Sequence, residues 1–280
     1  MPLANAHRYL IVMLGLTLWA FWPGYLSNLP AGKSAWHVHA AGALLWAVLV
    51  IVQSWSIHNG KRAFHKTVGL ASFVAFPLFL VGGVMAIYAE TVTLAAGLDD
   101  PANFSLGQFG TFDPLANIGF AVLFYGGLKA RRNVQLHSRY MISTTLFLVA
   151  PIVFRLLEQH VPGFSSDTPE TAYRFSYAMG VGNIAAFVIA IYLYRLAPKH
   201  GRPFLVAAGF IAAQGIGFET LGRVESFHWL FSRFSLLSEP WLIVVTFVVS
   251  VAIIWHGWNA GGAAGSGAKG GSGAPEAAQA

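Results

Sequence analysis

Long apolar stretches alternate with short polar gaps through the first 260 residues of the chain. A helix needs on the order of 20 apolar residues to cross the hydrocarbon core of a bilayer, and eight stretches approach that length. They run over residues 9–27, 36–57, 67–89, 114–128, 139–157, 173–196, 204–221 and 241–258. The pattern therefore predicts an all-α, polytopic transmembrane helix bundle of about eight spans, with seven as the lower count.

The same pattern predicts two regions of different character. Residues 1–260 form the transmembrane helical domain, and residues 261–280, rich in Gly, Ala and Ser, form a flexible cytoplasmic tail. Residues 222–239 mix aromatic with charged side chains, which favours a helix lying in the membrane interface. The first apolar stretch is longer than the roughly 7–15 residue core of a signal peptide, so we expect a retained helix rather than a cleaved leader.

Charge distinguishes the two sides of the predicted bundle. One alternating set of gaps holds twelve of the seventeen Lys and Arg residues, and the other set holds ten of the eleven Asp and Glu residues. Short loops rich in Lys and Arg stay on the cytoplasmic side during insertion. We therefore predict a multi-pass protein of the cell inner membrane with both termini in the cytoplasm.

Composition supports a lipid environment and narrows the chemistry. The chain is 56% hydrophobic and only 10% charged, with a mean hydropathy of +0.59. Its basic residues lie in short loops beside the spans, where anionic lipid headgroups are their neighbours, so no nucleic-acid partner is expected. The absence of Cys excludes disulfides, thiolate haem ligation and iron–sulfur clusters. Any metal must be bound through His, carboxylate or amide groups.

Polar residues within spans are costly and usually face the bundle interior. His39, Trp46 and Gln53 are spaced by seven, so they share one helix face through the depth of the membrane. An interhelical hydrogen bond for Gln53 and simple packing for Trp46 are the structural alternative.

His65 and His137 stand at the basic ends of the third and fifth spans. If those helices are neighbours, the two imidazoles could meet, and two neutral imidazoles can hold a b-type haem or begin a metal site. Arg155 follows His137 by eighteen residues, five helical turns, and so lies on the same face. The alternative is that both histidines are interfacial and bond phosphates or loop carbonyls.

A second set of candidate ligands lies at the opposite helix ends. His37, His39 and His160 are candidate metal ligands there, together with the carboxylates of Glu90, Asp113 and Glu158. Within one helix, however, His37 and His39 point about 160° apart. A solvated rim is the competing interpretation.

Several of these residues belong to motifs with a wider resemblance. The motifs are His39-x-x-Gly42, Gln53, His65-Lys66-x-x-Gly69, His137-x-Arg139-Tyr140-Met141-Ile142 and Phe154-Arg155. They resemble a family of uncharacterised bacterial multi-pass membrane proteins known only as a domain of unknown function. The resemblance covers residues 36–157, departs at Lys66, where Arg is more typical, and at Tyr140, where Trp is common, and implies architecture rather than activity.

A weaker resemblance, at the level of fold, is to the di-haem transmembrane cytochromes that carry electrons from ascorbate. Those proteins pair histidines of alternate helices near each side of the bilayer. His65 and His137 would be the inner pair, whereas the fourth span offers no His for an outer pair. The resemblance thus implies one haem more readily than two.

Three functional hypotheses follow. The first is a redox membrane protein that binds haem b or a metal at His65 and His137, with His39, Gln53 and Arg155 as further cofactor-binding residues and a quinone or another small molecule as partner. The second is a small-molecule or ion transporter with a path lined by intramembrane polar residues, namely Gln53, Asn117, Arg155, Asn183 and Gln214. The third is a non-catalytic scaffold or partner subunit. No hydrolase or phosphate-binding motif is present.

Overall fold

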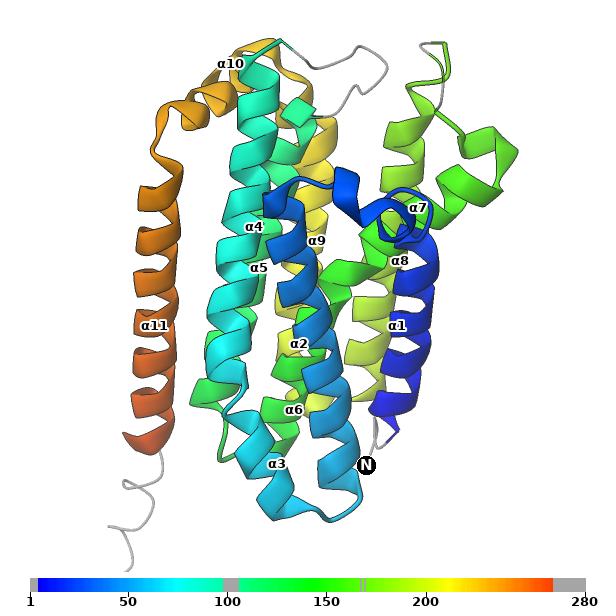
Figure 1. The fold of residues 1–280 in the computed structure, drawn as a ribbon. Coiled ribbons are helices and arrows are strands. Elements are labelled where there is room, and N and C mark those ends of the chain that lie inside the picture. The colour runs from blue at the N-terminus through cyan, green and yellow to red at the C-terminus, as the bar shows by residue number, and fades with distance from the viewer. Residues whose placement is uncertain (1–4, 98–105, 167, 169, 264–280) are drawn as a thin grey trace, which may run out of the picture.

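The computed structural model of the chain describes residues 5–97, 106–166, 168 and 170–263, and their regular structure is entirely helical (Figure 1). The α-helices are α1 Ala6–Phe21, α2 Ser34–His58, α3 Arg62–Gly69, α4 Ser72–Ala95, α5 Leu106–Lys129, α6 Val134–Ser143, α7 Val149–His160, α8 Arg174–Leu196, α9 Arg202–Glu219, α10 Glu225–Ser232 and α11 Glu239–Ala263. Short 3-10 segments are η1 Leu26–Ala31, η3 Thr144–Leu148, η4 Pro162–Phe164, η5 Pro198–His200, η6 Leu221–Arg223 and η7 Arg233–Leu236. The predicted all-α bundle is confirmed over this part of the chain.

Within the described residues, six helical segments are long and apolar enough to cross a membrane, fewer than the eight predicted. They are Ser34–His58, Arg62–Ala95, Val134–His160, Arg174–Leu196, Arg202–Arg223 and Glu239–Gly262. The other two predicted spans are helices as well. Helix α1 has only 16 residues, and α5 has 24 residues but carries Gln108, Asp113 and Asn117, which lower its hydropathy. The molecule thus has the helices of a multi-pass membrane protein.

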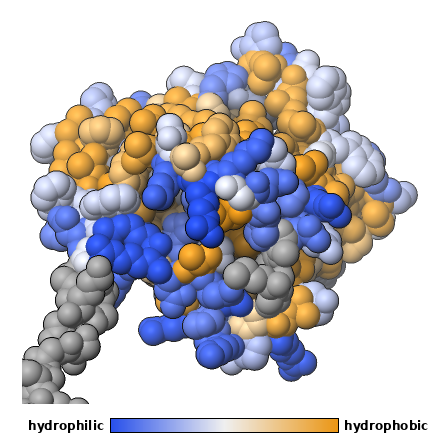
Figure 2. Space-filling model, turned by 90° about the horizontal axis from the view of Figure 1, so that it is seen from below, coloured by the Kyte–Doolittle hydropathy of each residue, from blue (hydrophilic) through white to orange (hydrophobic). Residues whose placement is uncertain are grey.

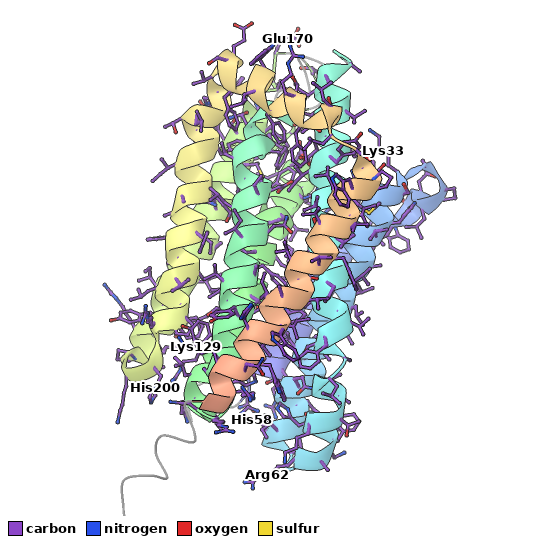
Figure 3. All side chains as sticks on the ribbon, turned by 90° about the vertical axis from the view of Figure 1, so that its left-hand side faces the viewer. Lys33, His58, Arg62, Lys129, Glu170 and His200 are labelled. Carbon is purple, nitrogen blue, oxygen red and sulfur yellow. The ribbon has the colours of Figure 1, made fainter. Side chains whose placement is uncertain are left out.

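Charged residues separate to the two ends of the bundle. Arg62 and Lys129 lie at one end together with His58 and His200, whereas Glu170 and Lys33 lie toward the other (Figure 3). We name the basic end by residues 58–66, 129–139 and 195–202, and the acidic end by residues 90–97, 158–166, 170–173 and 219–239. Hydrophilic side chains gather on the face seen at the basic end (Figure 2). Asp99, Asp100 and Asp167, also assigned to the acidic gaps, lie outside the described residues.

Helix α4 is central to the packing, with α2, α5 and α11 against it, while α7, α8 and α9 pack in succession and α1 lies against α2 and α7. Glycines let the backbones of α2 and α4 approach closely. A Cβ on Gly42 would lie 2.9 Å from the Cα of Phe79, and one on Gly82 would lie 2.7 Å from the Cα of His39. Such close contacts let helices associate in lipid, where burial of apolar surface gives little driving force.

Pro151 accounts for a break in the regular α-helical hydrogen bonding of the predicted fifth span. The predicted fifth span consists of α6, the 3-10 segment η3 and α7, and Pro151 follows that segment. Proline has no N–H for the carbonyl four residues earlier, and its ring crowds that carbonyl. The helix therefore changes its hydrogen-bonding pattern at mid-depth, between the two halves of the span.

Two predicted boundaries are wrong. The loop expected between Glu90 and Asp113 is shorter, because α4 continues to Ala95 and α5 already begins at Leu106. Both carboxyl groups therefore lie within helices rather than at a loop. Helix α11 extends through Ala263, past residue 261 where the tail was expected to begin, and residues 264–280 lie outside the described residues.

The expected interfacial segment over residues 222–239 contains the short helix α10 and η7, which cross the acidic end of the bundle (Figure 1). Phe231 is buried, while Trp229 and Leu230 are 59% and 61% exposed. One side of α10 thus packs onto the bundle and the other presents apolar side chains outward, as an interfacial helix does.

Candidate functional site

His65 lies in α3 at the basic end, and its ring is oriented by the last turns of α2. Its Nδ1 is 3.2 Å from the Gln53 main-chain oxygen and 3.4 Å from the Ser56 hydroxyl. A carbonyl oxygen only accepts, so Nδ1 carries the hydrogen in this bond. In the neutral ring the lone pair is then on Nε2.

His137 lies in α6 and is oriented in the same way by α5. Its Nδ1 is 2.8 Å from the main-chain oxygen of Gly127, in the last turn of α5, and donates to it. The last carbonyls of a helix have no partner within the helix, so the imidazole satisfies one of them. The bond again fixes the tautomer in which Nε2 keeps its lone pair. A histidine that binds a metal is oriented by a bond of this kind from its other ring nitrogen.

The structure brings these two imidazoles near each other. Helices α3 and α6 are not among the closely packed helix pairs, yet the two rings are close enough for their charges to interact. Both rings are partly buried. Two imidazoles from separate helices, each with its Nδ1–H engaged, therefore lie in the same part of the basic end.

Arg139 is a buried cation of the basic end that the sequence reasoning did not single out, two residues after His137 and about 160° around α6 from it. Its side chain is 4% exposed, and its guanidinium donates a 3.4 Å hydrogen bond to the main-chain oxygen of Gln135. No Asp or Glu among the described residues lies within 4 Å of it. A buried guanidinium without a carboxylate is a ready partner for an anionic group of a ligand. Its position two residues after His137 in the quoted motif was the available signal.

Gln53 borders the same region. Its Nε2 is buried and has no acceptor within the described part of the chain, and the amide faces Gly69 of α3. The side chain is thus free to bond a ligand, while its main-chain oxygen orients His65.

His39 and Arg155, the other predicted cofactor-binding residues, lie toward the acidic end and belong to a different cluster. The Glu90 and Asp113 carboxyl groups lie within hydrogen-bonding distance of each other. The Arg155 guanidinium interacts with Asp113, with Glu158 and with His39. The structure therefore separates the predicted set into two sites.

Two of the histidines predicted as metal ligands of the acidic end have other contacts in the structure. No group of three or more His, Cys, Asp or Glu side chains suited to a metal ion occurs within the described ranges. His37 uses both ring nitrogens, because Nε2 bonds the Gly32 oxygen at 3.1 Å and Nδ1 bonds the Tyr25 hydroxyl at 2.6 Å. His160 instead packs its ring against Trp19, 4.9 Å away between centroids.

The polar residues of the predicted transport path occupy separate helix contacts. Gln214 donates to the Phe112 main-chain oxygen at 3.0 Å, and Asn183 packs against Gly215 in the α8–α9 contact. Asn117 faces Gly83 in the α4–α5 contact. The Gln214 hydrogen bond thus joins α9 to α5, whereas Asn183 and Asn117 lie at two other helix contacts.

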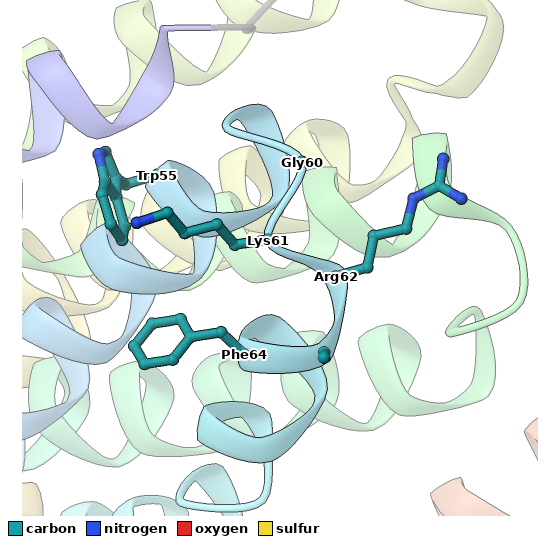
Figure 4. Close-up of a pocket in the computed structure, with 6 residues that line it drawn as sticks. Trp55, Gly60, Lys61, Arg62 and Phe64 are labelled. Carbon is teal, nitrogen blue, oxygen red and sulfur yellow. The ribbon is translucent and has the colours of Figure 1, made fainter.

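A cleft of about 480 Å³ lies at the α2–α3 turn, where the Lys61 ammonium is 4.3 Å from the centroid of the Trp55 ring (Figure 4). A second, mostly apolar hollow of about 400 Å³ lies between α4, α5, α10 and η7, with Asn117 as its polar residue. The first has the Trp and Lys composition of a membrane interface.

The described residues form an all-α bundle with six helical segments long and apolar enough to span a membrane, and with ionisable groups inside the bundle. No family model matches the chain, and neither the curated proteins nor the solved structures contain a match to it. Function is therefore argued from the residues themselves.

Proposed function

We propose that this protein is a redox protein of the inner membrane that binds one b-type haem between His65 and His137. The observation that carries the proposal is the pair of Nδ1 hydrogen bonds to main-chain oxygens, which leaves both Nε2 lone pairs available to iron. Bound haem supplies reversible one-electron transfer, and a quinone or another small molecule would exchange electrons with it.

Gln53 is the polar side chain best placed beside this group. Its buried Nε2 has no acceptor in the described structure, and its main-chain oxygen orients His65. We infer that the Gln53 amide bonds a polar edge of the haem. Arg139 is buried without a carboxylate partner in the described structure, but it points about 160° away from His137 around α6, so it is available to an anionic group on another side of that helix.

Histidine replacements test this proposal. His65→Ala and His137→Ala should each remove bound haem from protein purified out of haem-supplied cells, measured as the ratio of haem absorbance to protein. His137→Met should retain haem with a raised reduction potential, because a thioether can replace one imidazole.

His58→Ala is the matched control, because His58 lies at the same end, is exposed and bonds the Ser54 oxygen through Nδ1. It should keep the full haem content. If the two Nδ1 hydrogen bonds have only a structural role, the folded Ala variants should contain as much haem as wild type. That result in both variants would refute the proposal.

We further propose eight spans, with α1 and α5 crossing the membrane beside the six longer apolar segments, and the basic end in the cytoplasm. Because the chain has no Cys, single cysteines report topology without background. A membrane-impermeant thiol reagent should label Glu225→Cys from the outer side of the inner membrane, and Arg132→Cys only after the membrane is opened. Equal labelling of both from one side would show that the orientation is wrong.

A further inference from the structure

The acidic half of the bundle holds a pair of carboxyl groups that the haem proposal does not use. Glu90 comes from α4 and Asp113 from α5, at a level where Gly83 of α4 packs against Asn117 of α5. Glu90 lies seven residues after Gly83, and Asp113 lies four residues before Asn117. The two antiparallel helices therefore present the two carboxyl groups to each other.

The Glu90 carboxyl lacks the donors that a buried carboxylate requires. Its Oε2 is buried, and no N–H or hydroxyl group of the described residues donates to it. The Asp113 carboxyl lies within hydrogen-bonding distance. Two ionised carboxylates only accept hydrogen bonds and repel each other, so a bond between them requires one proton.

Charge balance also favours a single bound proton. Two carboxylates and the Arg155 guanidinium leave one net negative charge inside the membrane, where an unbalanced charge is expensive. Glu158, the third carboxylate near Arg155, is partly exposed at the end of α7 and is left out of this count because solvent can reach it. One proton makes the trio neutral. A metal cation is a poorer way to balance this charge than a proton. The positive charge of Arg155 would repel it, and the described residues offer no third ligand group for it.

Two further buried polar atoms nearby have no partner. They are Nδ1 of His39, a residue whose ring interacts with Arg155, and Oδ1 of Asn117, one turn from Asp113. Unsatisfied buried groups are rare, and several in one place indicate a site that holds something exchangeable.

The other titratable groups on the surrounding elements are engaged or distant. Glu158 of α7 accepts from the Ser166 hydroxyl, and the Tyr88 hydroxyl of α4 bonds the Ser235 oxygen at 3.4 Å. His228 of α10 bonds the Gly222 oxygen at 2.5 Å, and Arg233 of η7 lies over the Trp229 ring. On α11, Glu239 and His256 lie near opposite ends of the helix.

From this arrangement we propose that Glu90 and Asp113 form a proton-binding site in the acidic half of the membrane, with Arg155 balancing the carboxylate that remains. One O–H bond forms when the pair takes up a proton and breaks when it releases it. The site is independent of the haem, and it would let the protein exchange a proton with the acidic side.

Infrared spectroscopy of the full-length protein in lipid nanodiscs tests this site. At neutral pH the wild-type protein should show the carbonyl-stretch band of a protonated carboxyl group, shifted in heavy water. Glutamate labelled at its side-chain carboxyl carbon should move the band if the proton is mainly on Glu90. Labelled aspartate should move it if the proton is mainly on Asp113.

Variants complete the test. Glu90→Gln should abolish the band, because the remaining Asp113 carboxylate then interacts with Arg155 alone. Asp113→Asn should shift the band, because the charged acceptor is replaced by a neutral amide oxygen. The exposed Glu225→Gln serves as control and should leave it unchanged. Lack of the band in labelled and unlabelled wild-type protein would refute the proposal, as would its loss on adding sodium at constant pH, which would indicate a sodium site.

Discussion

Replacing Arg155 with leucine should destabilise the protein by about 1–3 kcal/mol, because it removes the cation that interacts with two carboxyl groups inside the bundle and leaves those groups less well satisfied. The guanidinium interacts with Asp113 and Glu158, and its carbon lies 4.1 Å from the centroid of the Phe21 ring. Leucine would keep some of the packing but leave two carboxylates without their cation. Thermal unfolding of purified protein, followed by circular dichroism, would measure the loss.

Arg223→Leu is the matched control, since Arg223 also pairs with a carboxylate, that of Glu219, but at the surface. Both side chains of that pair are more than 40% exposed, at 44% and 43%. Exposed pairs contribute about 0–1 kcal/mol, so this variant should unfold near the wild-type temperature. If Arg155→Leu proved as stable as Arg223→Leu, the interior cluster would have no energetic role.

Trp46→Ala should cost about 3–5 kcal/mol, because it opens a cavity at the centre of the bundle. Trp46 is 2% exposed, and its indole N–H donates a 2.9 Å hydrogen bond to the Thr144 hydroxyl. Its ring makes edge contacts with Phe120 and Phe124, at centroid distances of 4.9 and 5.4 Å. The same unfolding measurement applies.

Two related variants separate the causes of that loss. Trp46→Phe keeps most of the packing and should lose about 0.5–1.5 kcal/mol with the hydrogen bond. Trp255→Ala removes an indole that is 67% exposed on α11 and should have little effect. A Trp46→Ala protein as stable as Trp255→Ala would show that the core does not depend on this residue.

The order of helices could be predicted from hydropathy because each crossing segment must satisfy its own backbone hydrogen bonds and so forms a helix. The ends could not be predicted as well. Helix α1 ends at Phe21, before Pro23 and Gly24, although the apolar residues continue. Hydropathy did not predict helix over the first turns of α5, because they carry the polar residues Gln108 and Asp113. The fold accommodates Gln108 there, because its side chain bonds the Phe218 main-chain oxygen of α9.

The candidate sites show the same division. The spacing of His39, Trp46 and Gln53 predicted that the three residues share one face of α2. In the structure His39 lies against the backbone of Gly82, Trp46 bonds the Thr144 hydroxyl, and the Gln53 amide faces Gly69. Spacing could not show that Glu90 and Asp113 face each other, because that depends on how α4 and α5 pack. It also missed Arg139, whose burial follows from the fold of the basic end.

The measurement that tests the central claim most directly is the visible spectrum of the purified full-length protein from haem-supplied cells. We expect about one haem per chain and the sharp reduced-minus-oxidised bands of iron held by two imidazoles. A folded, colourless protein without extractable haem would contradict the assignment of His65 and His137 as haem ligands.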